Sequence, residues 1–183
     1  EVRLRLAETA IELKEGQEAF DHADIVLAKD KDNPDVHVIK GKALLLLGKK
    51  EDALLAFEHS VELEPKNEGG RFMLAFIYRE LGLDKEAMDS LQKLLAMNKN
   101  HEAGRILLAE MLAARGSKDM AINEYKTVQK INPKNSSIYF PLGKLLMDNK
   151  DYEGARKYLE IAVKYDPGSL EAHLLFGSVL KTL

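Results

Sequence analysis

The sequence predicts an all-α solenoid in which helix–turn–helix units repeat every 34 residues. Small residues recur at two fixed places of this period, and residues typical of helix ends recur between the helical stretches. The chain of 183 residues has only 12 Gly and 5 Pro, which is few for a loop-rich or all-β protein. Units of this kind stack on their neighbours, so we expect one continuous core rather than separate domains.

Two places of the period hold small side chains throughout. Steps of 34 residues from Gly41 meet only Gly or Ala, at Ala7, Gly41, Ala75, Ala109, Gly143 and Gly177. The same steps from Ala53 meet only Ala, at Ala19, Ala53, Ala87, Ala121 and Ala155. Small residues are expected where two helices cross closely, because a larger side chain there costs about 1–3 kcal/mol. Phe57 and its equivalents are expected to fill the space beside them: Leu91, Tyr125 and Leu159, with Ala23 in the first unit.

The first helix of each unit has clear end signals in the second unit. Asn33 suits the N-cap and Pro34 the first helical position, and the helix is expected to run to about Leu47. Gly48 is expected to end it, because Gly readily takes the left-handed conformation that follows a helix. Lys150 occupies the equivalent place in the fifth unit, where we expect a less well-formed turn.

The second helix of that unit is expected from about Glu51 to Leu63, with its apolar residues on one face. Pro65 ends it and Asn67 can cap the following helix. Two later stretches, 132–135 and 166–169, repeat this pattern of turn residues.

Pro141 falls inside the expected first helix of the fifth unit, where proline removes a backbone hydrogen bond. One interpretation is that this helix simply starts late, at about Ser137. The alternative is a kink that turns Phe140 into a binding groove.

These features resemble the tetratricopeptide repeat (TPR) family: period 34, small residues at the eighth and twentieth places, an aromatic residue or Leu at the twenty-fourth and Pro at the thirty-second. The resemblance implies a right-handed α-solenoid, a tetratricopeptide-like superhelix that serves as a protein-interaction scaffold. It covers the whole chain as a single solenoid over 1–183, with units at about 1–33, 34–67, 68–101, 102–135 and 136–169 and a lone C-terminal helix at 170–183. We expect the chain to be a fragment of a longer protein.

The fourth place departs from the aromatic residue that is usual in this family, because its occupants are His37, Arg71, Arg105, Tyr139 and His173. For the two histidines we favour a packing role over a ligand role. No two histidines have the i, i+4 spacing of a helical metal site, so we expect neither a metal nor a cofactor.

Composition narrows the function further. A net charge of −3 gives no basic field for nucleic acid, and the absence of Cys removes thiolate catalysis and disulfides. No phosphate-cradling loop or nucleophile motif occurs, so we expect no enzyme activity. No apolar run reaches the length of a membrane span, so we expect a soluble protein without direct membrane insertion. The sequence does not distinguish a cytoplasmic from a periplasmic location.

The resemblance places ligands in a groove lined by the first helix of each unit. The fifth place of the unit is apolar throughout, and Phe76 stands one helical turn after Phe72. We expect an apolar floor with basic residues at its edge, which would suit an amphipathic helix or an extended apolar peptide. The floor consists of Phe72, Phe76, Ile106 and Phe140, and the edge of Lys42, Arg79 and Lys144. Val38 is expected to be a further residue of the groove. The alternative is that the fifth-place residues pack between neighbouring helices as part of the core.

The expected last helix, 170–183, is apolar around much of its circumference, although a terminal helix of a solenoid should be polar outside. Either a further unit follows in the parent protein or this end self-associates. The leading prediction is a non-catalytic scaffold that binds a partner peptide or helix in the groove, within a multiprotein assembly. The alternatives are a self-associating structural oligomer, or the targeting arm of a larger protein of secretion or exopolysaccharide machinery or of an enzyme.

Overall fold

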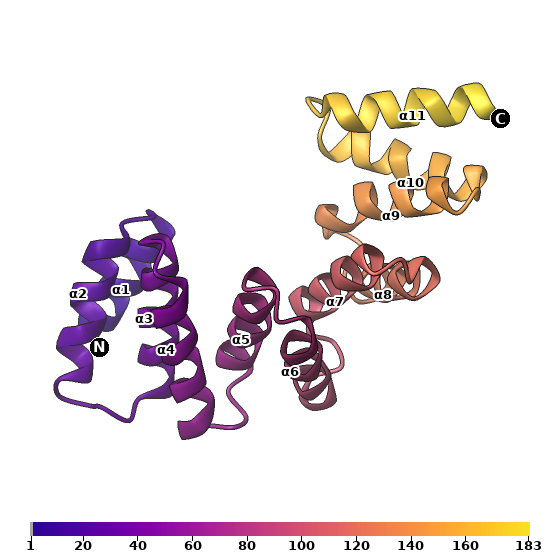
Figure 1. The fold of residues 1–183 in the computed structure, drawn as a ribbon. Helices are drawn as coiled ribbons and strands as arrows, with labels where there is room; N and C mark the ends of the chain where they lie inside the picture. Colours follow the sequence, from indigo (N-terminus) through magenta and orange to yellow (C-terminus); the bar gives the residue numbers. More distant parts are fainter. Residues whose placement is uncertain (1) are drawn as a thin grey trace. The chain divides into compact units, whose positions relative to one another are not determined.

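The computed structural model describes residues 2–183, and within this range the chain forms eleven α-helices, one short 3-10 helix and no strand (Figure 1). The chain divides into two compact units, one ending at Lys99 and the other comprising Asn100–Leu183. Residue 1, with which the expected first repeat begins, lies outside the described range. The fold class predicted from the sequence is confirmed.

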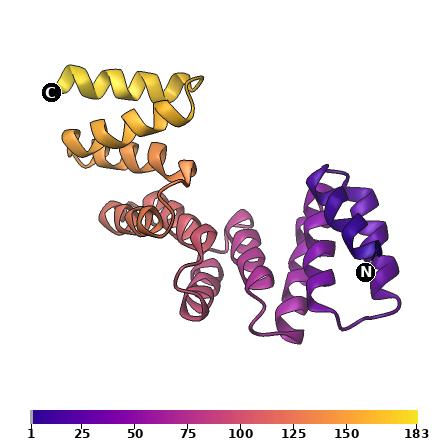
Figure 2. The same cartoon turned by 180° about the vertical axis from the view of Figure 1, so that it is seen from behind.

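The first unit contains three helical hairpins, formed by α1 (Val2–Glu12) with α2 (Gly16–Leu27), α3 (Pro34–Leu46) with α4 (Lys50–Leu63), and α5 (Glu68–Glu80) with α6 (Asp84–Met97). Each hairpin also packs on the next, because α2 contacts α3 and α4 contacts α5. Figure 2 shows these hairpins from behind, with neighbouring helices side by side. The first helices of successive repeats, α1, α3 and α5, also contact one another in order.

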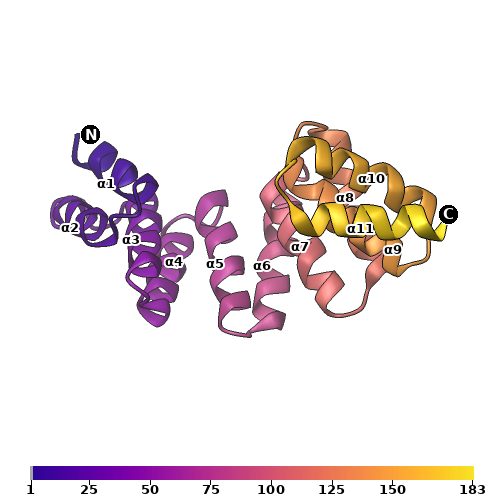
Figure 3. The same ribbon diagram turned by 90° about the horizontal axis from the view of Figure 1, so that it is seen from above.

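The second unit continues the same pattern with α7 (Glu102–Ala114), α8 (Lys118–Ile131), α9 (Tyr139–Asp148), α10 (Tyr152–Tyr165) and α11 (Leu170–Thr182). A 3-10 turn, Ser136–Ile138, precedes α9. In this unit α7 pairs with α8 and α9 with α10, and α11 packs on α10 (Figure 3).

Close helix crossing explains the small places of the period. Phe57 is fully buried, and a Cβ added at Gly41 would lie within 2.7 Å of its ring. In the second unit, a Cβ at Gly143 would lie 2.7 Å from Cγ of the buried Leu159. Each glycine therefore leaves the space that the large side chain of the facing helix occupies, as the sequence predicted.

The helix N-caps form at the predicted residues. The Asn33 side chain accepts a hydrogen bond from the Val36 amide at 3.3 Å, with Pro34 opening α3. Asn67 accepts from the Gly70 amide at 2.6 Å, and Ser169 accepts from the Ala172 amide at 3.3 Å. These bonds satisfy backbone donors that the first turn of a helix leaves free, and they fix where each repeat begins.

The turn at Lys150 corrects one expectation. Gly48, Gly82 and Gly116 take positive φ angles of 74°, 74° and 79°, and Lys150 takes the same conformation with φ 62°. The Lys150 amide donates to the Met147 carbonyl at 2.9 Å, as the Gly48 amide donates to the Leu45 carbonyl at 3.0 Å. The prediction of a less well-formed turn was wrong, because the hydrogen bonds form with Lys in the left-handed region.

The helix with Pro141 starts late, as the first interpretation proposed, although two residues further along than Ser137. The regular helix α9 begins at Tyr139, so Pro141 lies in its first turn, where an amide has no intrahelical acceptor. No kink is needed to accommodate the proline.

The fourth place of the repeat has a polar role that the sequence did not reveal. His37 Nε2 donates to the Lys31 carbonyl at 2.8 Å, and His173 Nε2 donates to the Pro167 carbonyl at 3.0 Å. Arg71 and Tyr139 likewise donate to the carbonyl six residues upstream. This place therefore holds a side chain that bonds the preceding turn, a role that His, Arg and Tyr can all fill.

Candidate functional site

The first helix of each repeat carries the residues predicted for the groove, and within each unit we call the surface that these helices form the helix-A face. In the first unit, Val38 is buried at 7% exposure on α3, and four other predicted residues are half-buried: Lys42 on α3 and Phe72, Phe76 and Arg79 on α5. In the second unit Ile106 on α7 and Phe140 on α9 are half-buried, and Lys144 is exposed.

A cleft of about 430 Å³ opens on the helix-A face of the first unit. Val38 and Lys42 of α3 line it, together with Glu8 of α1 and Gly69 of α5. Its mouth is polar, because acidic residues also contribute to the lining. Asn67 stabilises the wall by donating to Asp35 Oδ1 at 2.8 Å while it caps α5. The structure thus brings Val38 and Lys42 together beside an open, mainly polar cleft.

A second cleft, of about 340 Å³, lies in the second unit on the side of α9 that faces α11. Phe140 and Pro141 line it, with Tyr165 at the end of α10 and Glu171 at the start of α11. Phe140 stands three periods after Val38, so the fifth place of the repeat lines a cleft in both units. The two clefts lie at equivalent positions of the repeat and are lined by different side chains.

Phe76 and Arg79 form a local pair on α5. The Arg79 guanidinium lies 5.1 Å from the centroid of the Phe76 ring, and its Nη2 is 3.1 Å from Glu80 Oε1. Lys50 Nζ of α4 lies 3.4 Å from Glu80 Oε2. The hydrogen bond from Arg79 lowers the pKa of the Glu80 carboxyl, with Lys50 acting in the same direction. Arg79, which was predicted for the edge of the apolar floor, therefore lies over the ring of the predicted floor residue Phe76.

The last helix presents an open apolar side. Leu174 is 64% exposed and Leu180 50% exposed on α11. Within residues 2–183 a Cβ at Gly177 would meet nothing within 4 Å, although Gly41 and Gly143 at the same place are each covered by a large side chain. Lys144 of α9 pairs with Glu171 of α11 at 3.6 Å, so this predicted groove residue also joins two successive first helices.

Sequence reasoning missed a groove on the opposite side of the first unit, over α3 between α2 and α4. Phe20 of α2, Leu44 of α3 and Leu55 of α4 line this groove, whose volume is about 410 Å³. The sequence signal for this groove is Leu55, an apolar residue on the otherwise polar side of α4. In the structure its side chain is 64% exposed. Among residues 2–183 no group of His, Cys, Asp and Glu side chains could hold a metal ion.

Comparisons with known proteins identify the repeat. The tetratricopeptide repeat family matches residues 34–67, 70–101 and 112–178, which together make up more than half of the chain. The BBSome complex member BBS4 of Bos taurus is 29% identical over 141 residues, which cover 77% of this chain and 27% of that protein. DnaJ homolog subfamily C member 3 of Mus musculus is 33% identical over 103 residues, covering 55% of this chain and 20% of that protein. The chain therefore spans about a quarter or less of these relatives' length.

Solved structures share the fold at low sequence identity. The Pseudomonas aeruginosa PilF structure superposes with a TM-score of 0.92 at 14% identity, covering 99% of this chain and 82% of PilF. The structure of YrrB, described as a TPR protein with an unusual peptide-binding site, superposes with a TM-score of 0.70 at 21% identity. The superposition covers 99% of this chain and 91% of YrrB. In the part of the chain that the structure describes, no helix is both long and apolar enough to cross a membrane.

Proposed function

Because the chain belongs to the tetratricopeptide repeat family, we propose that it is a non-catalytic protein-interaction scaffold whose helix-A face binds a partner peptide or helix. The observation that carries this proposal is the recurrence of a cleft at the fifth place of the repeat in both compact units. In each unit, a cleft on rigid helices can hold a side chain of a partner segment. YrrB, which shares this fold, supports the idea because its structure is described with a peptide-binding site.

The proposed contacts differ between the units. In the first unit, Lys42 offers a cation beside Val38, and the Phe76–Arg79 pair offers an aromatic surface. In the second unit, Phe140 offers an apolar contact in its own cleft, and Ile106 and Lys144 extend the helix-A face. Aromatic side chains are frequent binding hot spots, and a partner that covers the exposed part of these rings would remove further apolar area from water.

Affinity capture from an extract of the source organism tests this function. The bait is wild-type protein, the double variant Phe72→Glu/Phe76→Glu, or Lys42→Glu, with Lys85→Glu on the exposed start of α6 as the matched charge control. We expect a partner that the wild type and Lys85→Glu capture and that both helix-A variants lose. Circular dichroism must show that the double variant folds, and Lys42→Glu gives a second test that leaves the aromatic packing intact. A partner retained by Lys42→Glu and by a folded double variant contradicts the proposal.

A second candidate function, self-association through α11, has its own supporting observation. The uncovered Gly177 place and the exposed Leu174 and Leu180 offer the side on which a second copy could pack. Light scattering over a range of concentrations tests it. Self-association predicts a mass that rises with concentration in the wild type and not in Leu174→Glu/Leu180→Glu. A constant monomer mass in the wild type rejects it.

A further inference from the structure

The side of the first unit opposite the helix-A face carries two grooves at equivalent positions of the repeat. One lies over α3 between α2 and α4, and the other lies over α5 between α4 and α6. Their volumes are similar, about 410 Å³ and about 420 Å³. Lining positions correspond one period apart, since Leu44 and Leu55 of the first groove stand where Tyr78 and Asp89 stand in the second. The backbone is thus repeated, whereas the side chains differ.

The groove over α3 is the apolar member of the pair. Leu44 is buried at its floor, the half-buried Phe20 ring forms one wall, and Leu55 is 64% exposed at its mouth. A single exposed leucine is ordinary on a protein surface. Here it borders a hollow with an aromatic wall, so a side chain of leucine or phenylalanine size could bury itself against both residues. The volume lies within the range of roughly 300–1,000 Å³ that is typical of ligand sites.

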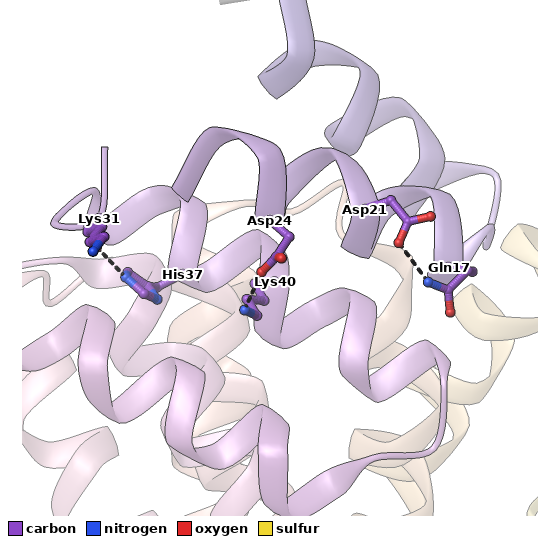
Figure 4. A network of polar contacts seen from close by, with 6 residues as sticks. All are labelled: Gln17, Asp21, Asp24, Lys31, His37 and Lys40. Carbon is purple, nitrogen blue, oxygen red and sulfur yellow. Dashed lines mark hydrogen bonds and ion pairs between the residues drawn. The ribbon is translucent and has the colours of Figure 1, made fainter. Parts of the chain in front are cut away.

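The charge at the rim of this groove favours an acidic ligand. Lys40 and Lys49 line the groove with one carboxylate, Asp52, and Asp24 beside the groove pairs with Lys40, so Lys49 carries the positive charge that a ligand would meet. Lys40 is held in place, because its Nζ lies 2.7 Å from Asp24 Oδ1 (Figure 4). The same Nζ lies 5.1 Å from the centroid of the Phe20 ring. Lys49 is exposed and forms no ion pair with any residue of 2–183, which leaves its ammonium available to a ligand.

The two histidines of the groove complete its wall. The His37 ring donates to the Lys31 carbonyl at 2.8 Å (Figure 4), and the His59 ring packs edge-on against it at a centroid distance of 4.5 Å. The bond to Lys31 fixes the His37 ring, and the His59 ring, whose Nδ1 lies 3.5 Å from Glu62 Oε2, completes this edge of the hollow.

The groove over α5 has the opposite character. Four carboxylates line it, from Glu58, Glu62, Glu86 and Asp89, against Arg71 and Lys93. Both cations are already engaged, because Arg71 Nη2 donates to the Pro65 carbonyl at 2.6 Å and Lys93 Nζ pairs with Asp89 at 2.6 Å. Tyr78 donates to Glu58 at 2.9 Å and fills the floor with a polar group. An acidic ligand would therefore be repelled from the groove over α5 and attracted to its equivalent over α3.

We propose that the groove over α3 is a second docking site, which takes an acidic partner segment that inserts a leucine- or phenylalanine-sized side chain between Phe20 and Leu55 and places a carboxylate beside Lys49. The apolar hollow supplies the anchor, and the charge difference between the two equivalent grooves sets where along the unit the segment binds. This inference does not depend on the proposed function, because the groove shares no residue with the clefts of the helix-A face.

NMR titration of the full 183-residue chain tests this proposal. The probe is a synthetic amphipathic peptide with leucines at i and i+4 and glutamates between them, and the control is the same peptide with lysine in place of glutamate. We expect saturable shifts of backbone amides around Leu44, Leu55 and His59 with the acidic peptide and weaker binding of the lysine peptide. Leu55→Asp, which installs the residue of the other groove, should weaken binding by about tenfold or more. Lys49→Glu should weaken it by about fivefold.

Two variants in the second unit serve as matched controls. Met120→Asp removes an exposed apolar side chain, and Lys134→Glu reverses an exposed charge, so both should bind as the wild type does. The proposal is overturned if the acidic peptide gives no saturable shifts in this groove, if Leu55→Asp and Lys49→Glu bind it as well as the controls do, or if the lysine peptide binds equally tightly. Shifts confined to Val38 and Lys42 would also overturn it, and would instead support binding on the helix-A face.

Discussion

In the two compact units, different large side chains fill the space where the two helices of a repeat cross closely. In the first, Gly41 leaves room for the ring of Phe57, and in the second Gly143 leaves room for Leu159. The cleft beside the helix-A face is lined at the fifth place by Val38 in one unit and by Phe140 in the other. The repeat therefore fixes where a small residue faces a large one, while the identity of the large residue varies. This freedom lets the surface differ between units without a change of backbone.

The largest expected effect is on the buried large residues. Phe57→Ala should lower the free energy of unfolding by about 3–5 kcal/mol, because it leaves a ring-sized cavity against Gly41. Leu159→Ala leaves a smaller cavity and should cost about 2–4 kcal/mol. Urea unfolding followed by circular dichroism measures the loss, and native-state hydrogen exchange locates it. A larger loss for Leu159→Ala than for Phe57→Ala, or exchange that rises equally in both units, would contradict this comparison.

A smaller effect is expected at the glycines themselves. Gly41→Ala should destabilise by about 1–3 kcal/mol, because the new methyl group meets a rigid ring within 2.7 Å. Gly143→Ala should cost a similar amount, because the new methyl group would lie 2.7 Å from Cγ of the fully buried Leu159 and 3.2 Å from its backbone nitrogen. Phe57→Leu in the Gly41→Ala background should recover part of the loss, and a double-mutant cycle measures this coupling. Strictly additive effects would show that the two residues do not interlock.

The turns that end the first helices give a third comparison. Gly48→Ala should destabilise by about 1 kcal/mol, because an alanine must take a φ near 74°. Lys150→Gly should stabilise by less than about 1 kcal/mol, because the relief of left-handed strain exceeds the added freedom of the unfolded chain. Thermal unfolding of both variants measures whether each substitution lowers or raises the stability. A loss of stability in Lys150→Gly would show that the lysine side chain contributes more than its backbone strain costs.

The smallest effect is the contribution of His37, in the first unit, to the pH dependence of stability. Burial lowers the pKa of His37 from its ordinary value of 6.5, and the positive charges of His59 and Lys40 add to this, whereas the turn carbonyl of Lys31 and Asp32 oppose it. As the pH falls through 6.5, the unfolded chain takes up this proton before the folded chain does, so stability falls until the folded His37 is also protonated. Burial raises the pKa of Tyr139, the equivalent donor in the second unit, which stays neutral throughout this range.

Replacing His37 by tyrosine, the residue at the equivalent position 139, isolates the contribution of His37 to the pH dependence of stability. His37→Tyr should keep the hydrogen-bond donor to the turn carbonyl. It should remove the part of the stability loss between pH 7.5 and 5.5 that protonation of His37 causes. Unfolding at both pH values, compared with the wild type, measures the difference. An unchanged pH dependence in His37→Tyr would assign the effect to the other histidines.

The fold followed from periodicity, because small residues, caps and turn residues each have a local physical cause. Asn33, Asn67 and Gly48 act where the sequence places them, since a cap or a left-handed turn depends only on its neighbours. Lys150 was misjudged because hydrogen bonds across the turn outweigh the backbone preference of a single residue.

The surfaces were harder to predict than the helices. The resemblance indicated which residues line the helix-A face, and the structure gives Val38, Lys42 and Phe140 places beside clefts. The groove over α3 escaped prediction because Phe20, Leu44 and Leu55 come from three helices, and helical periodicity describes each helix alone. The bond of His37 to a turn carbonyl was missed for the same reason, because it joins a side chain to the preceding loop.

Site-specific photo-crosslinking tests the central claim, partner binding on the helix-A face, most directly. A photoreactive phenylalanine analogue is placed at Lys42 or Lys144 on this face, or at Lys85 on α6, and each protein is irradiated with the partner that affinity capture identifies. We expect partner adducts from Lys42 and Lys144 and none from Lys85. Adducts from Lys85 alone, or equally from all three positions, would contradict binding on the helix-A face.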